Sequence, residues 1–193
     1  MPRSKEFDPQ AALHRAMLVF WEKGFTATSY EDLVQATGVN RYGLYSAFGD
    51  KQECFLTAMD HYANTVITFL LGPMEHADAS IAEIRRYFAM LLNCLGTPQE
   101  HFGCLIGNSA VEIAAPDEAL VARIDTHFAR MRAAFRNALR GAQARGEIAG
   151  DRDVEAFADY LVGVAMGYVV CVRGGMEAEQ VKRFIAVALT QLH

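Results

Sequence analysis

An all-helical fold is predicted by three observations on this sequence of 193 residues. Apolar residues recur three and four positions apart along most of the chain, as on one face of a helix, and the strict alternation typical of strands does not occur. Hydrophobic residues make up 52% of the chain, enough for a sizeable core. Capping residues and glycines divide the chain into about nine helices, so we expect a small N-terminal domain over residues 1–50 and a larger helical domain over residues 51–193.

The first helix should begin at Asp8, because an aspartate side chain accepts hydrogen bonds from the free amides of a helix start. Pro9 suits the first helical position, and Gly24 should end the helix. The inward face is expected to hold Leu13, Ala16, Met17 and Phe20.

Two further short helices complete the N-terminal domain. The residues from Thr28 to Glu31 have the spacing of a capping box, and the helix that they start should stop at Gly38. The next helix is expected to start with Asn40 as its N-cap and to close at Gly49. A tight glycine-containing turn between two short helices is typical of a helix-turn-helix.

The larger domain should contain six longer helices. A capping box of Asp50 and Glu53 opens the first of them, which is expected to break at Gly72 and Pro73. The others are expected over residues 81–95, 102–114, 117–145, 153–173 and 177–192.

Composition disfavours several classes of protein. The longest nearly apolar run, residues 161–172, is shorter than a membrane span, and the first ten residues contain no apolar signal region, so we expect a cytoplasmic protein. The four cysteines form no C-x-x-C pair, which argues against a disulfide framework and a structural metal site. The common catalytic and nucleotide-binding motifs are absent, so neither an enzyme nor a cofactor is expected.

The third helix carries the candidate functional residues. On a helical wheel, Leu44, Ala47 and Phe48 share one face and should pack inward. The remaining faces present Arg41, Tyr42, Gly43, Tyr45 and Ser46. Arginine can donate two hydrogen bonds to a guanine edge, tyrosine can bind phosphates, and a glycine lets a helix approach closely. The alternative is an ordinary solvated helix whose aromatic rings pack on a neighbour.

Lys51 lies in the first turn of the fourth helix, where the helix dipole disfavours a positive charge. A DNA phosphate held between this ammonium and the free amides of the helix start would relieve the conflict.

The segment from residue 8 to about residue 56 resembles the N-terminal domain of the tetracycline-repressor (TetR-type) family of bacterial transcriptional regulators. The matching stretches are F-x-x-x-G-F-x-x-T-S at residues 20–29, L-V-x-x-T-G-V at residues 33–39 and G-L-Y-S-A-F-G-D-K at residues 43–51. The rest of the chain matches only in the number and order of its helices.

The resemblance implies a homodimer that binds a near-palindromic operator in double-stranded DNA and leaves it when a small effector enters the larger domain. Carried over by position, Tyr45 and Lys51 correspond to residues that bind phosphates. Arg41, Tyr42 and Gly43 correspond to positions that face bases, and Thr28 and Ser29 correspond to positions near the DNA backbone. One feature departs from the family: residues 1–60 contain six basic and eight acidic residues, a net charge of −2.

The last two helices are expected to form the dimer interface. The segment 153–173 offers small residues at Gly163 and Gly167, and the last helix offers an apolar face of Val181, Phe184, Ile185, Ala188 and Leu189. A second copy could bury these residues in a four-helix bundle, as the resemblance implies. Packing within one chain is the alternative.

The segment 117–145 carries six arginines. We expect a solvated polar face there, with a second DNA-binding surface as the alternative.

The segment 102–114 places polar residues on one side of an apolar helix. His101, Cys104, Asn108 and Glu112 fall within one narrow sector of the wheel. Three interpretations stay open: buried hydrogen bonds between helices, the polar end of an effector pocket, or a reactive thiol that senses electrophiles or oxidants. The other expected pocket residues are Phe88, Met90, Phe128, Met131, Phe135, Tyr160, Met166 and Tyr168.

The sequence therefore favours a ligand-responsive repressor. The alternatives are a thiol-based sensor of the same family and a helical protein-interaction module without DNA binding.

Overall fold

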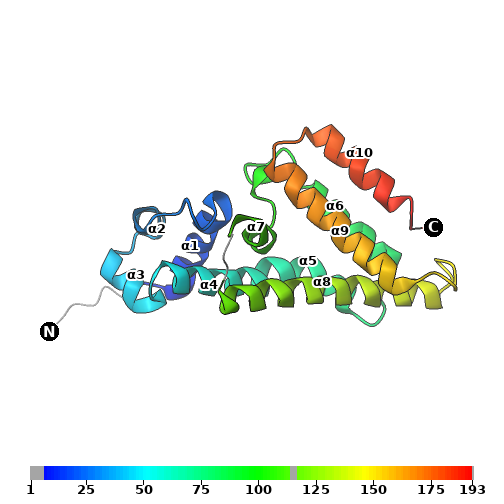
Figure 1. Ribbon diagram of the computed structural model, residues 1–193, viewed down its shortest axis with the longest axis horizontal. Coiled ribbons are helices and arrows are strands. Elements are labelled where there is room, and N and C mark those ends of the chain that lie inside the picture. Colours follow the sequence, from blue (N-terminus) through cyan, green and yellow to red (C-terminus); the bar gives the residue numbers. More distant parts are fainter. Residues whose placement is uncertain (1–6, 114–116, 193) are drawn as a thin grey trace.

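The computed structural model describes residues 7–113 and 117–192, and every regular element within them is helical. Three short helices, α1 (Pro9–Lys23), α2 (Tyr30–Thr37) and α3 (Arg41–Phe48), gather at one end of an elongated molecule (Figure 1). The C-terminal end of the chain lies toward the opposite end. The fold is therefore the all-helical arrangement that the sequence predicts.

Local capping sets the boundaries of the N-terminal helices. The Asp8 carboxylate accepts hydrogen bonds from the amides of Gln10 and Ala11, as expected. The cap of α2 differs from the prediction, because Ser29 and Asp32 form the capping box instead of Thr28 and Glu31. The expected inward face of α1 is confirmed, with Leu13, Ala16, Met17 and Phe20 all buried.

The fourth helix runs past its expected end. Helix α4 (Lys51–Tyr62) continues through a π-helical turn (Ala63–Ile67) into α5 (Thr68–Glu75), so the break predicted at Gly72 and Pro73 is wrong. Tertiary contacts hold the turn that contains Pro73: Met74 is fully buried, and the side-chain amide of Asn137 donates to the carbonyl of Met74. The stability gained from these contacts offsets the cost of a proline inside the helix.

Helix α8 (Glu118–Ala144) lies along α4 and α5 (Figure 1). Two arginines of α8 bind carboxylates there with paired hydrogen bonds: Arg123 binds Asp60 at 2.7 and 2.8 Å, and Arg130 binds Glu75 at 2.7 and 3.0 Å. This geometry fixes both the position and the rotation of α8.

Helices α6 (Ile81–Leu92), α9 (Val154–Arg173) and α10 (Ala178–Leu189) cover the far half of the molecule. Helix α9 ends at the expected residue 173, whereas α6 and α10 each stop three residues before the expected residues 95 and 192. Helix α9 is long and apolar enough to cross a membrane, with a mean hydropathy of 1.5, but it packs against α8 and α10 along one face.

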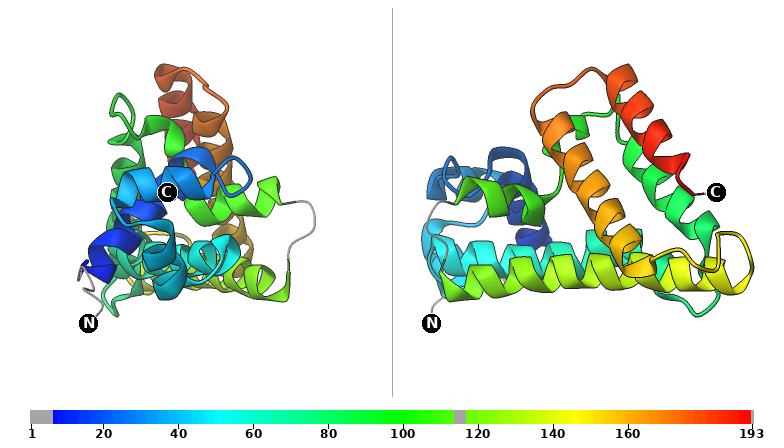
Figure 2. Two further views of the ribbon diagram at one scale, coloured as in Figure 1. Left: turned by 90° about the vertical axis from the view of Figure 1, so that its left-hand side faces the viewer. Right: turned by 45° about the vertical axis from the view of Figure 1, so that its right-hand side comes forward.

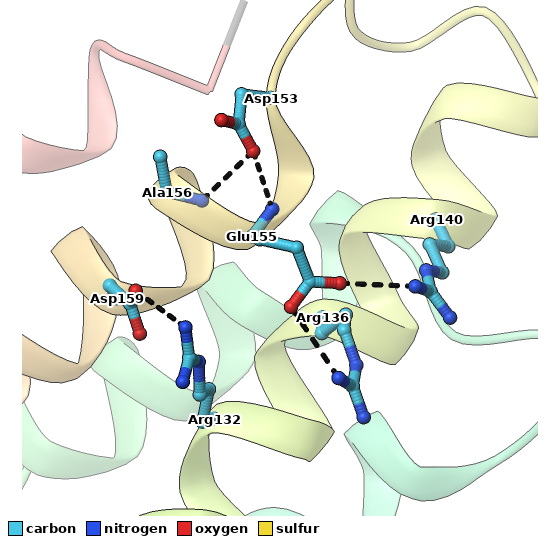
Figure 3. A network of polar contacts seen from close by, with 7 residues as sticks. All are labelled: Arg132, Arg136, Arg140, Asp153, Glu155, Ala156 and Asp159. Carbon is cyan, nitrogen blue, oxygen red and sulfur yellow. Dashed lines mark hydrogen bonds and ion pairs between the residues drawn. The ribbon is translucent and has the colours of Figure 1, made fainter.

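Figure 3 shows the junction of α8 and α9, where Arg136 and Arg140 bind the Glu155 carboxylate and Arg132 binds Asp159. Arg145 is 3.3 Å from Glu147 and donates to the carbonyl of Asp78. The five arginines of α8 and Arg145, which follows it, thus all have carboxylate partners in the same chain, which favours a solvated polar face over a second DNA-binding surface.

Helix α7 (Leu105–Glu112) is shorter than the helix predicted over 102–114. A 3-10 turn (Glu100–Phe102) precedes it, and Gly103 turns the chain with a φ of +65°, which favours glycine. Figure 2 shows α7 between the N-terminal helices and α9. It also contacts α4 and α8, so it lies where the two halves of the molecule meet.

Candidate functional site: an exposed helix face and a buried cavity

Helix α3 presents an exposed aromatic and basic face. The side chains of Tyr42 and Tyr45 are 83% and 56% exposed. Together with Arg41 and Ser46 they line an open hollow on the surface. The structure therefore brings these four predicted residues together on one face.

Tyr30 supports this face, although the sequence reasoning missed it. Its hydroxyl donates to the carbonyl of Gly49 at 2.6 Å, which joins α2 to the end of α3. Its ring lies 5.1 Å from the guanidinium of Arg41 and stacks on Tyr45 at 6.1 Å. The only signal in the sequence was an aromatic residue in the first turn of a short capped helix.

The structure gives a packing reason for the glycine at position 43, which the helical wheel did not show. A Cβ atom at this position would lie 2.9 Å from Val39, whose side chain is buried beneath the start of α3. The glycine thus lets Val39 pack against the helix. Leu44 is buried and Phe48 is half-buried as expected, but Ala47 is exposed, because this short helix contacts its neighbours along a narrower face than the wheel predicts.

Two of the side chains expected at the DNA backbone, Thr28 and Lys51, are engaged within the protein. Thr28 is buried, and its hydroxyl donates to the carbonyl of Gly24, so it is not an exposed contact. The ammonium of Lys51 donates to the carbonyls of Phe25 and Thr28, each at 3.0 Å. These carbonyls offset the unfavourable helix dipole, and one of the three ammonium protons remains for another acceptor. Ser29 is exposed and caps α2.

A cavity of about 210 Å³ lies among α4, α5, α6, α8, α9 and the start of α7. Its wall is mostly apolar. Polar groups enter it from Tyr62, Tyr87, Cys104 and His127, and Trp21 of α1 forms part of the wall.

Five of the expected pocket residues, Met90, Cys104, Met131, Met166 and Tyr168, line this cavity. Phe88 and Phe135 are instead core residues that stack on each other at 6.0 Å. Tyr160 is 42% exposed beside Phe157, and Phe128 is half-buried next to the His127 ring, outside the cavity wall. A helical wheel shows which residues share a face but not which helix covers that face.

The other expected pocket residues make hydrogen bonds away from the cavity. His101 is exposed, pairs with Glu100 at 3.0 Å and has its Nδ1 atom 3.1 Å from the carbonyl of Val172. The amide of Asn108 donates to the carbonyl of Phe102. Asn108 and Glu112 stabilise the ends of α7, and neither they nor His101 line this cavity.

Cys104 belongs to a buried chain of polar groups. Its sulfur caps α7 by accepting a hydrogen bond from the Gly107 amide at 3.4 Å, and it is also hydrogen-bonded to the Tyr62 hydroxyl. Nε2 of His127 lies 3.7 Å from the sulfur. Nδ1 of His127 is the buried side-chain nitrogen or oxygen without a partner in the described part of the chain.

Burial keeps these groups uncharged near neutral pH. It raises the pKa of the Cys104 thiol and of the Tyr62 and Tyr87 hydroxyls. It lowers the pKa of His127 to about 4, with the Arg130 charge as a smaller cause. The polar end of the cavity is therefore neutral, and Cys104 is a thiol instead of the nucleophilic thiolate.

Helix α7 is bonded to the N-terminal domain at both ends. At its start, Nε1 of Trp21 donates to the carbonyl of Gly103 at 3.1 Å. At its end, the Glu112 carboxylate accepts hydrogen bonds from the amides of Phe25 and Thr26 at 3.2 and 2.7 Å. The helix next to the cavity therefore also holds the turn between α1 and α2.

The expected dimer residues fall into two groups. Val181, Ile185 and Ala188 are buried in the core of their own chain, and Leu189 is partly buried. Gly167 faces the ring of Phe184 from the same chain, and a Cβ there would lie 3.1 Å from it. Gly163 and Phe184 are exposed, and they lie on the same two helices as Val170 and Val187, which are 59% and 66% exposed.

No group of three or more potential metal ligands occurs in residues 7–113 and 117–192.

Known families match both halves of the chain. Residues 12–58 match the bacterial regulatory proteins of the tetR family, and residues 80–188 match the tetracyclin repressor-like C-terminal domain. The uncharacterized HTH-type transcriptional regulator YezE of Bacillus subtilis is 32% identical over 194 residues, covering 100% of both chains. The HTH-type transcriptional repressor ComR of Escherichia coli is 29% identical, covering 97% of this chain and 90% of its own.

A solved structure agrees with these matches. A cysteine mutant of the TetR family regulator CifR, complexed with a 26-base-pair operator DNA, superposes with a TM-score of 0.85 at 25% identity, covering 98% of each chain. The family models, the full-length relatives and the exposed α3 face agree, and the chain therefore belongs to the TetR family and is a DNA-binding transcriptional regulator.

Proposed function

We propose that this regulator is a cytoplasmic homodimeric repressor that leaves a near-palindromic operator when a small molecule occupies the cavity next to α7. The observation that supports release is the position of α7, which borders the cavity and bonds the N-terminal domain at both ends. ComR and the mycobacterial protein DhaR, 23% identical, are named as repressors. The proposal includes no catalytic activity and no cofactor.

The α3 face supports the DNA-binding role. Residues 1–50 form the DNA-binding domain of this proposal, and residues 51–193 form the effector-binding and dimerisation domain. Arg41 extends from the start of α3, where a guanidinium can donate two hydrogen bonds to a guanine edge. The exposed hydroxyls of Tyr42, Tyr45 and Ser46 are suited to phosphate oxygens.

The outer face of α9 and α10 supports a dimer. Tyr160, Gly163, Gly167 and Val170 follow one another at helical spacing along α9, beside Phe184 and Val187 of α10. An exposed apolar surface of this kind is typical of an interface. A second copy related by a two-fold axis would bury it and would place two α3 helices on successive major grooves.

Replacing Gly163 with Lys tests the dimer. This glycine has no neighbour within 4 Å of an added Cβ, so the chain should fold unchanged while the charge prevents association. Gly72→Lys is the matched control, because Gly72 is also a helical glycine with open space around it. Light scattering should give the mass of two chains for the wild type and the control, and of one chain for Gly163→Lys. A dimeric Gly163→Lys protein would refute this interface.

A gel-shift assay tests whether the protein binds its operator and is released by an effector. The DNA upstream of the protein's own gene is the first target, and small molecules that raise the melting temperature are then added to the complex. Release by a molecule that binds the cavity supports the proposal, whereas tighter DNA binding would indicate a co-repressor mechanism instead. A thiol sensor receives less support, because Cys104 is buried and its thiol is neutral.

A further inference from the structure

We propose that Arg173, at the end of α9, is a positioning residue that sets the spacing between the two DNA half-sites that the dimer recognises. The inference rests on the proposed dimer through α9 and α10. It gives Arg173 a role in operator selection that requires no contact between this side chain and DNA.

Arg173 joins the proposed dimer helix to the N-terminal domain. Its Nη1 atom donates to the carbonyl of Glu22, in the last turn of α1, at 2.9 Å. The same nitrogen lies 3.4 Å from the carbonyl of His101, which precedes α7. Within residues 7–113 and 117–192, Arg173 is the one residue of α9 with a hydrogen bond or ion pair to the N-terminal domain. A single side chain thus connects two elements that are far apart in the sequence.

Electrostatics favour a guanidinium at this point. The last carbonyls of a helix have no partner within the helix, and they carry a partial negative charge. Arg173 lies in the last turn of α9 and reaches the last turn of α1. One cation therefore offsets the negative ends of two helices that approach each other. A neutral side chain at position 173 would lose both the hydrogen bond to Glu22 and this favourable charge.

The Arg173 bond differs from the bonds that α7 makes. Trp21 and Glu112 join the N-terminal domain to the α7 segment, which is not part of the proposed interface. The outer face of α9 would instead pack on the partner chain, so α9 has a fixed place relative to the two-fold axis. The Arg173 bond therefore runs directly from an interface helix to the domain that carries α3.

The separation of the two α3 helices should depend on this bond. One base pair added between the half-sites moves them about 3.4 Å apart and rotates them by about 35°, since a turn of DNA contains about 10–10.5 base pairs. To follow this change, each N-terminal domain must shift relative to α9 of its own chain. The wild-type dimer then has to break one Arg173 bond in each chain. A variant without this bond should tolerate the altered spacing better.

Duplexes that differ only in half-site spacing test the inference. Selection from random duplexes with the full-length wild-type protein gives the operator. Three further duplexes contain one base pair more between the half-sites, one base pair fewer, or a single half-site, and fluorescence anisotropy measures the dissociation constant of each. The spacing preference is the ratio of the dissociation constants on the altered and the selected spacing. Arg173→Ala should reduce this ratio about fivefold, while binding to the single half-site stays unchanged.

Two further variants separate positioning from a loss of charge. Arg132→Ala also removes an arginine bonded to α9, but its partner Asp159 belongs to α9 and not to the contact with the N-terminal domain, so the ratio should keep its wild-type value. Arg173→Lys keeps a cation that can donate to the Glu22 carbonyl and should restore part of the preference. Because Arg173 is exposed, both of its variants should fold and show the mass of two chains in light scattering.

Each result supports or overturns one of the two proposals. A lower ratio in Arg173→Ala that Arg173→Lys partly restores supports the role of Arg173. An unchanged ratio, an equal loss of affinity on all four duplexes, or a wild type without spacing preference would overturn it. A dimeric Gly163→Lys protein would instead refute the interface on which the inference rests, and light scattering shows this independently of the duplexes.

Discussion

The α3 face and the α7 cavity have opposite physical properties. The face is open and exposed, and it is basic at Arg41. The capping bonds of α2 and α3 hold it in place, together with the Tyr30 ring that stacks on Tyr45. The cavity lies inside the larger domain and is mostly apolar, and its lining residues come from segments far apart in the sequence. The first surface is suited to a polyanion, whereas the second is suited to an apolar molecule. Helix α7 begins beside the cavity and is bonded to the turn between α1 and α2, so one short element can relate two sites of different chemistry.

The largest expected effect is at the α3 face. Arg41→Ala should weaken binding to the operator by about 2–6 kcal/mol for a dimer, because each half-site loses a contact of about 1–3 kcal/mol. Fluorescence anisotropy at one salt concentration should show a much smaller loss on a scrambled duplex. Arg132→Ala is the control, since Arg132 binds Asp159 far from α3. An equal loss on both duplexes would contradict base recognition by Arg41.

The next effect is a pH dependence of stability that arises at the cavity and not at the α3 face. The folded-state pKa of His127 is lowered from 6.5 to about 4, so the unfolded chain binds the proton first as the pH falls. The free energy of unfolding should therefore decrease between about pH 6.5 and pH 4, by on the order of 3 kcal/mol from this group. Urea unfolding at pH 7 and pH 4.5 measures the loss. The free energy of unfolding of the His127→Leu protein should decrease less over this pH range. The same pH dependence in both proteins would refute the assignment of this effect to His127.

A smaller effect is expected at the connection between the regions. Glu112→Ala removes the acceptor for the amides of Phe25 and Thr26. We expect about a tenfold weaker coupling between effector and DNA, with effector affinity in the absence of DNA little changed. Glu118→Gln, an exposed carboxylate at the start of α8, is the control. Unchanged coupling in Glu112→Ala would show that the signal passes elsewhere.

The smallest effect concerns the thiols. N-ethylmaleimide at pH 7 should modify the exposed Cys94 about tenfold faster than the buried Cys104, because the reagent must reach the sulfur. Peptide mass mapping over time gives both rates. If Cys104 reacts first and Cys104→Ser abolishes release of DNA by the reagent, the thiol-sensor alternative becomes the better one.

The two regions also differ in what their sequence reveals. Asp8, Asn40 and the pair of Asp50 and Glu53 were predicted as caps, because a cap and its partner amides lie within four residues of each other. The α3 face follows from the same local spacing.

The cavity depends on contacts between distant segments. His127 and Tyr62 are 65 positions apart and meet Cys104 only in the folded chain, so no short motif marks them. Similarly, packing of Met74 overrides the stop signal at Gly72 and Pro73.

The attachment of α7 at both ends fixes how many residues it can contain. Its eight residues, Leu105–Glu112, span about 12 Å, and they separate the Gly103 carbonyl that Trp21 binds from the Glu112 carboxylate that binds the turn after α1. One inserted residue would lengthen the helix by about 1.5 Å and rotate Glu112 by about 100° away from its amides. Insertions and deletions should therefore be tolerated far less in this segment than in surface turns. The helix therefore acts as a spacer of defined length, and we expect its number of residues to matter for function as much as its side chains do.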